Sequence, residues 1–152
     1  AGRAPRLVPA LRTLLDDFDA SARQMALLSL KLVFELLPGA FGEDPVRELY
    51  PELLKRLDDS ADAVRRDACA ALGAFFAHAP PQHVAGSVLE YSADQLLVHM
   101  DDPDPAMQDA SLEVLLVLSR IEPEKIKSKT QEAKKSHRTP VFCDKLLDRI
   151  NC

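Results

Sequence analysis

The chain has 152 residues, 47% of them hydrophobic and 5% aromatic, with no tryptophan and a formal net charge of -5. This length suits one domain, and the apolar fraction is enough for a continuous core. The negative charge argues against nonspecific nucleic-acid binding, which needs a basic surface to neutralise phosphates. No apolar run is long enough to cross a membrane and no apolar leader opens the sequence, so we expect a soluble, cytoplasmic protein.

A helical hairpin is predicted in the middle of the chain, around residues 49–80. Apolar residues recur at helical spacing on both sides of a polar break at residues 58–62. They are Val46, Leu49, Leu53 and Leu57 before the break, and Val64, Ala68, Leu72, Phe75 and Ala79 after it. Because the break is short, the two helices are expected to be antiparallel neighbours.

The same hairpin recurs along the sequence. Its turn is marked by pairs of aspartates 42 and 43 residues apart, namely Asp16-Asp17, Asp58-Asp59 and Asp101-Asp102. This period is typical of two-helix solenoid units. Arg23 and Arg65 repeat in the same register, whereas Gln108 stands at the third position. One hairpin cannot bury its apolar face alone, so the units are expected to stack.

The turn and the residues after it resemble the HEAT-repeat family, most closely at Asp58, Val64, Arg65 and Ala68. The resemblance covers roughly residues 6–123 and implies an all-α solenoid of about three hairpins, at about 6–39, 44–80 and 86–123. Residues 124–138 are predicted as a basic helix or linker, and residues 139–152 as a C-terminal capping helix over the last repeat. Because the chain starts without Met and almost directly on a repeat, we expect it to be part of a longer protein.

The starts of the second helices carry predicted caps. Asp19 and Asp104 precede two of these helices and can accept hydrogen bonds from their first amides. Ala61 stands at the equivalent place in the middle repeat, so Ser60 or Asp62 is expected to cap that helix instead.

The residue types that carry catalysis or bind metals do not gather in a recognised pattern. Three cysteines form an odd count without paired spacing, which fits reduced thiols in an intracellular protein. The four histidines lack helical ligand spacing with a Cys or carboxylate, and no glycine-rich phosphate loop is present. The acidic pairs recur at the repeat period, so we interpret them as turn and capping residues rather than as acid–base catalysts. We therefore predict no catalytic residues, no enzyme activity, no metal, no cofactor and no small-molecule substrate.

A basic stretch follows the third repeat and allows two interpretations. Its cations are Lys125, Lys127, Lys129, Lys134, Lys135 and Arg138. The first interpretation is a solvated helix or linker, and the second is a docking patch for an acidic partner. Nucleic acid or anionic lipid is a third and weaker alternative.

The C-terminal segment carries a narrower resemblance. Residues 137–147 read HRTPVFCDKLL and follow VHMDDP at residues 98–103. Together with residues 49–59 they resemble the C-terminal end of the HEAT-repeat axonemal dynein assembly factors. This resemblance implies a noncatalytic scaffold for cytoplasmic preassembly of the dynein arms of motile cilia, with dynein chains, other assembly factors or chaperones as partners, and neither nucleic acid nor membrane.

Two other classes of function stay open. An importin-like transport receptor or a phosphatase regulatory subunit would share the repeats but lack this C-terminal segment. An enzyme is the third class, which turnover or a bound metal would reveal.

The candidate partner-binding surface follows from the second helices, which usually line the concave face of HEAT proteins. The residues opposite their core stripes are Gln24, Leu28, Lys31 and Glu35 in repeat one, Arg66, Ala70, Gly73 and Ala77 in repeat two, and Asp109, Glu113, Leu116 and Arg120 in repeat three. They predict a shallow groove with small residues in the middle, apolar flanks and a charged rim, suited to an amphipathic partner helix. The alternative is that Ala70 and Gly73 are small because neighbouring helices pack closely there.

Overall fold

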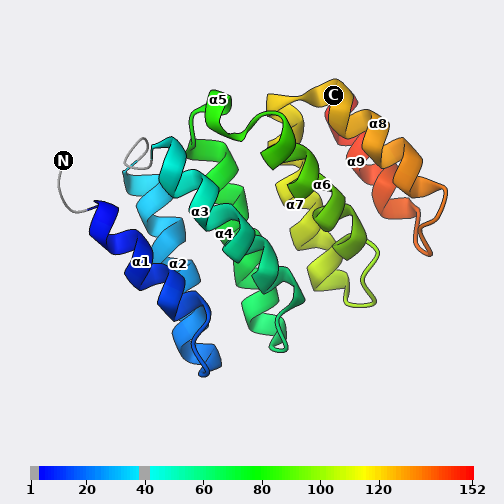
Figure 1. The fold of residues 1–152 in the computed structure, drawn as a ribbon. Helices are drawn as coiled ribbons and strands as arrows, with labels where there is room; N and C mark the ends of the chain where they lie inside the picture. Colours follow the sequence, from blue (N-terminus) through cyan, green and yellow to red (C-terminus); the bar gives the residue numbers. More distant parts are fainter. Residues whose placement is uncertain (1–3, 38–41) are drawn as a thin grey trace. The chain divides into compact units, whose positions relative to one another are not determined.

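The computed structural model describes residues 4–37 and 42–152, and the chain divides into two compact units, residues 1–84 and 85–152. Unit 1 contains α1 (Ala4–Leu15), α2 (Ala20–Leu36), α3 (Glu43–Lys55), the 3-10 turn η1 (Arg56–Asp58), α4 (Asp62–His78) and α5 (Pro81–Val84) (Figure 1). Unit 2 contains α6 (Ser87–His99), α7 (Pro105–Ile121), α8 (Pro123–Lys134) and α9 (Val141–Asn151). Within the described ranges every regular element is a helix, which confirms the predicted all-α class. The predicted boundary at residue 39 lies outside the described residues.

Unit 1 consists of two helical hairpins that pack on each other. Helix α1 pairs with α2 and α3 pairs with α4, while α2 packs along α4 and α1 lies beside α3 (Figure 1). Eight of the nine predicted core positions of the middle hairpin are buried. Ala79 is the half-buried one, because it follows the end of α4 as its C-cap. The ring of Phe34 on α2 packs edge to face on that of Phe75 on α4, with 5.3 Å between the ring centroids. An aromatic contact therefore joins the two hairpins.

The repeated aspartates close the turns between paired helices. The second aspartate of each pair accepts a hydrogen bond from the amide two residues later, at 2.8 Å for Asp17, 3.0 Å for Asp59 and 2.9 Å for Asp102. This geometry is the one expected of Asx turns. The turn interpretation of the acidic pairs is therefore confirmed.

Two of the predicted helix caps are present and one prediction was wrong. The Asp19 and Asp104 carboxylates accept from the amides of Ser21 and Ala106, at 3.1 and 3.0 Å. At α4, neither Ser60 nor Asp62 caps the helix, because Ala61 itself is the N-cap residue and no side chain bonds to its first amides.

A buried ionic network joins the first hairpin to the second. The Asp59 carboxylate accepts from Arg23 Nε and Nη2 at 2.8 and 2.9 Å and from Arg56 Nη1 at 3.0 Å. Its side chain is only 2% exposed, and those of Arg23 and Arg56 are 10% and 11% exposed. Burial alone would raise the pKa of Asp59, but the hydrogen bonds from Arg23 and the Ala61 amide, with both guanidinium charges, hold it below its ordinary value.

Unit 2 also consists of two hairpins, α6–α7 and α8–α9. The basic stretch is helical from Pro123 to Lys134, and its Ile126 and Thr130 side chains are buried. Helix α9 packs on both α7 and α8 and buries Cys143 and Leu146. The segment after repeat three thus forms a further hairpin of the same kind, with α9 as its second helix.

Unit 2 has a neutral hydrogen bond between its hairpins at the repeat position where unit 1 has the Arg23–Asp59 ion pair. Gln108, which replaces the repeated arginine, donates from Nε2 to Thr139 Oγ1 at 2.9 Å and to the Met100 carbonyl at 3.3 Å. Asp101 accepts from the amides of Arg138 and Thr139 at 2.9 and 2.8 Å and from Thr139 Oγ1 at 2.7 Å. These hydrogen bonds therefore hold the turn between α8 and α9 against the turn between α6 and α7.

Candidate protein-binding surfaces

The predicted partner-binding residues fall into two sets. Gln24, Leu28, Lys31 and Glu35 lie on α2 and Arg66, Ala70, Gly73 and Ala77 on α4 of unit 1, whereas Asp109, Glu113, Leu116 and Arg120 lie on α7 of unit 2. Most of the twelve are exposed. Leu116 was predicted as exposed apolar surface, and this prediction was wrong. The side chain is only 7% exposed, because α9 packs against α7 beside it.

The small residues of α4 face solvent to different degrees. Ala70 and Ala77 are exposed, and Gly73 is half-buried. Close packing against a neighbouring helix therefore does not account for the small size of Ala70. Beside them, Gln24 Nε2 of α2 donates to Asp67 Oδ2 of α4 at 3.0 Å, so this polar contact ties the two helices together along the predicted surface.

An apolar stripe on α2 extends the predicted set. Met25, Leu28, Leu32 and Leu36 follow one another at spacings of three and four and are 68%, 49%, 53% and 73% exposed. Residues so spaced lie on one face of a helix. Sequence reasoning had selected Leu28 alone, although the same spacing was visible in the sequence. The exposed surface of unit 1 is thus more apolar than predicted, a feature typical of interaction sites.

The cations of the basic stretch are matched by carboxylates. On α8, Lys125 pairs with Glu90 of α6 at 2.9 Å and Lys129 pairs with Asp94 of α6 at 2.7 Å. Lys134 pairs with Asp144 of α9 at 2.5 Å. The hydrogen bond to Glu90 is the main reason that the pKa of Lys125 is raised, and the hydrogen bond to Asp144 is the main reason that the pKa of Lys134 is raised. Such exposed pairs stabilise little individually, but together they orient α8 between its neighbours.

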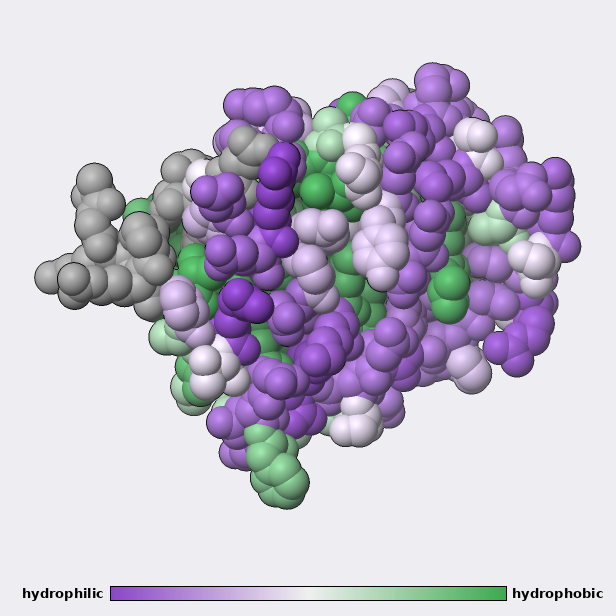
Figure 2. Space-filling view, viewed as in Figure 1, coloured by the Kyte–Doolittle hydropathy of each residue, from purple (hydrophilic) through white to green (hydrophobic). Residues whose placement is uncertain are grey.

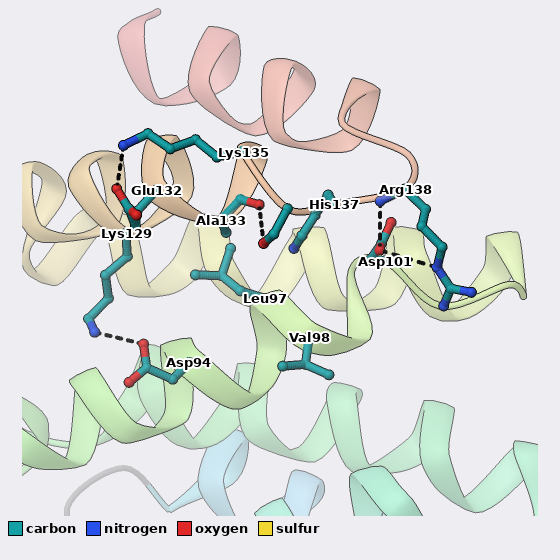
Figure 3. Close-up of a pocket in the computed structure, with 11 residues that line it drawn as sticks. Asp94, Leu97, Val98, Asp101, Lys129, Glu132, Ala133, Lys135, His137 and Arg138 are labelled. Atoms are coloured by element: carbon teal, nitrogen blue, oxygen red, sulfur yellow. Dashed lines mark hydrogen bonds and ion pairs between the residues drawn. The ribbon is translucent and has the colours of Figure 1, made fainter.

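The remaining cations are paired locally. Lys127 lies 3.3 Å from Glu124, Lys135 lies 2.7 Å from Glu132, and Arg138 lies 3.7 Å from Asp101. Several of these pairs border a cavity of about 620 Å³ whose wall includes Leu97 and Val98 (Figure 3). The visible surface of α8 is mostly hydrophilic (Figure 2). Matched charges favour the solvated helix over the docking patch for an acidic partner.

A cysteine and a histidine meet in unit 2 without forming a reactive pair. Cys143 Sγ lies 3.3 Å from His137 Nδ1, and His137 in turn lies close to the Asp101 carboxylate (Figure 3). Burial raises the pKa of the Cys143 thiol to about 11, with a smaller contribution from the charges of Asp144 and Asp101. A nucleophilic cysteine needs the opposite, a lowered pKa and access to solvent. The arrangement therefore has a packing role.

Asp101→Asn is expected to loosen the α8–α9 turn. Burial opposes ionisation of Asp101, but the amides of Arg138 and Thr139 and the Thr139 hydroxyl lower its pKa to about 2. Because the folded pKa lies below the unfolded value near 3.9, the carboxylate stabilises the fold above about pH 4 and loses this effect as pH falls toward 2. Asparagine keeps one acceptor oxygen and turns its amide toward the Arg138 N–H donor. We expect a loss of about 1 to 2 kcal/mol at pH 7, measured by urea denaturation.

The difference between Asp101→Asn and the parent chain should shrink as the pH is lowered through 4 toward 2. Asp148→Asn, which changes an exposed carboxylate of α9, serves as the control and should cost little at any pH. A loss from Asp101→Asn that does not vary with pH would show that the carboxylate charge is not what holds the turn.

No helix in the described part of the chain is long and apolar enough to cross a bilayer. Between residues 4–37 and 42–152, no group of three or more His, Cys, Asp or Glu side chains is arranged to hold a metal ion.

Comparisons with known proteins define the class of this fold. Residues 23–75 match the HEAT-like repeat family. The crystal structure of an engineered protein superposes with a TM-score of 0.63 at 15% identity, covering 95% of this chain and 62% of that one. Residues 23–75 are thus a HEAT-like repeat segment, and the superposition shows a shared fold over 95% of the chain.

Its sequence is similar to one particular assembly factor in three species. Dynein axonemal assembly factor 5 is 31% identical in Xenopus laevis, 33% in Homo sapiens and 30% in Mus musculus, each over 147 residues and 95% of this chain. The chain spans 17% to 18% of the length of these curated relatives. The family resemblance expected from the C-terminal segment is confirmed.

Proposed function

We propose that this chain is a noncatalytic protein-interaction scaffold that assists cytoplasmic preassembly of axonemal dynein arms. The observation that carries the proposal is its similarity, over 95% of its length, to dynein axonemal assembly factor 5. The repeat fold supports it, because stacked hairpins offer extended surfaces for other chains. The raised pKa of the buried Cys143 thiol also argues against nucleophilic chemistry at the Cys–His contact.

Cross-linking mass spectrometry of the full-length protein from ciliating cells tests this function. We expect cross-links from residues of this region to axonemal dynein chains or to other assembly factors and chaperones. Cross-links to nuclear transport cargo, or to a phosphatase catalytic subunit, would contradict the proposal and favour another kind of HEAT scaffold.

Within this function, we assign partner binding to the exposed sides of α2 and α4. Ala70→Glu places a charged side chain among the small residues of α4, where Ala70 is exposed and Leu28 of α2 offers apolar surface. Because Ala70 is not part of the core, the melting temperature should stay within a few degrees of the parent. Recovery of dynein chains with the full-length protein should fall at least tenfold.

A matched control separates binding from folding in this experiment. Ala10→Glu makes the same change at an exposed position on α1 and should leave recovery of dynein chains unchanged. If Ala70→Glu unfolds the region, Ala70 belongs to the core. If the variant folds and still recovers dynein chains, the assignment of this surface is wrong.

A further inference from the structure

A groove runs between α7 and α9 in unit 2, and Arg149 divides it into two cavities of about 530 and 280 Å³. The first is bordered by Asp109 and Glu113 of α7 and by Lys145 and Asp148 of α9, and the second by Leu116 and Arg120 of α7. All four residues predicted on α7 thus border this groove. Sequence reasoning did not foresee its other wall, because α9 was expected only to cap the last repeat.

The two ends of the groove carry opposite net charges. Two carboxylates, Asp109 and Asp148, outnumber one cation, Lys145, at the end near the start of α7, whereas Arg120 lies near the C-terminal end of α7. The centre is already neutralised, since Arg149 Nη1 lies 2.6 Å from Glu113 Oε1. Among the described residues, neither Asp109 nor Arg120 forms such an ion pair, so both end charges are available to a partner.

Apolar side chains lie between the charged ends. Leu112 and Leu116 form the α7 side but are only 4% and 7% exposed, so the half-buried Ile150 of α9, beside the second cavity, is the most exposed of these apolar side chains. Asp109 and Arg120 are eleven residues apart, which corresponds to about 16 Å along a helix axis. A complementary ligand therefore needs opposite charges about three helical turns apart with apolar side chains between them.

We propose that this groove binds an amphipathic helix of a partner protein, antiparallel to α7, with an acidic residue near its N-terminus and a basic residue near its C-terminus. In this orientation the acidic residue faces Arg120 and the basic residue faces Asp109 and Asp148. The same order of charges is favoured by the partner helix's own dipole, so its internal stability and its fit to the groove agree. The inference rests on the proposed scaffold function and gives one of its partners a defined chemistry.

The test uses two synthetic helices of identical composition, each held helical by a hydrocarbon staple on the solvent side. One carries Glu in its first turn, leucines at helical spacing and Lys in its last turn, and the other has Glu and Lys exchanged. The readout is the native thiol of Cys152, which is exposed at the second cavity, whereas Cys69 and Cys143 are buried. We expect the first helix to slow the reaction of Cys152 with a disulfide reagent at least tenfold, and the second to leave the rate unchanged.

Exchanging the charges at the ends of the groove tests whether the preference between the two helices comes from the groove or from a property of the peptides themselves. In the variant Asp109→Lys with Arg120→Glu, the preference should invert, so that the second helix protects Cys152 and the first does not. The matched control exchanges an exposed ion pair outside the groove, as Glu132→Lys with Lys135→Glu, and should keep the parental preference. Circular dichroism of each variant verifies that the fold is retained.

Equal protection by both helices, or protection by neither, would overturn the inference. So would a preference that does not invert in the exchanged variant. These outcomes are independent of the proposed function, because cross-links to dynein chains are measured on the full-length protein and do not require this groove. Loss of the cross-links with retained peptide selectivity would instead overturn the function and leave the groove a helix-binding site.

Discussion

Asp59→Ala is expected to lower the free energy of unfolding of unit 1 by about 3 to 5 kcal/mol, because it leaves buried cations without their acceptor. Arg23 donates two hydrogen bonds and Arg56 donates one to this carboxylate. The Asp59 side chain is 2% exposed, so water cannot replace the lost acceptor without opening the structure. Alanine also removes the acceptor for the Ala61 amide, which loosens the turn into α4.

Urea denaturation followed by circular dichroism measures this loss. Glu48→Ala is the control, since it removes an exposed carboxylate that lies 3.7 Å from Arg12, and such a pair contributes roughly 0 to 1 kcal/mol. A loss below about 1 kcal/mol for Asp59→Ala would mean that the network does not hold the two hairpins together.

The same carboxylate should make unit 1 sensitive to acid. Since the folded pKa of Asp59 is lowered, its contribution is fully present above its unfolded pKa near 3.9 and disappears as pH falls through the folded value. The difference between Asp59→Ala and the parent chain should therefore narrow below about pH 4.

Leu72→Ala is expected to cost about 2 to 5 kcal/mol, the range found for buried leucines replaced by alanine. Leu72 lies on α4 and is 0% exposed, so truncation removes its burial and leaves a cavity. The same substitution at Leu32 of α2, which is 53% exposed, is the matched control and should change stability by less than about 0.5 kcal/mol. Thermal and urea unfolding of both variants compares the two sites. A cost under about 0.5 kcal/mol for Leu72→Ala would place it outside the core.

The fold was predictable from the sequence because two of its signals are local and repeated. The apolar spacing of the middle hairpin identified residues such as Leu53 and Leu72, which are fully buried. The aspartate pairs identified the turns, since an Asx turn needs only a carboxylate and the amide two residues later. Neither inference requires knowledge of which hairpin packs against which.

The candidate surfaces were less predictable because they depend on contacts between distant parts of the chain. The helical spacing of α7 places Leu116 opposite the core stripe, where an exposed residue is expected, but α9 packs beside it and buries it. From the sequence alone, Lys125 and Lys129 have no assigned partners. In the structure α8 lies next to α6, so they pair with Glu90 and Asp94. The sequence did contain a signal for these ion pairs: the two lysines are four residues apart, and so are the two carboxylates. This matched spacing predicts pairing only once α6 and α8 are known to be neighbours.

The contacts between hairpins also restrict which hairpins can be neighbours. In unit 1 the contact is a buried arginine on an aspartate, and in unit 2 it is an amide on the hydroxyl of Thr139. A hairpin that presented glutamine instead of arginine to Asp59 would leave this buried anion short of donors and without its main counter-charge. Repeat proteins are prone to pairing the wrong copies as they fold, and this difference in polarity makes such exchanges costly. The single change from arginine to Gln108 thereby helps to fix the order of the hairpins along the chain.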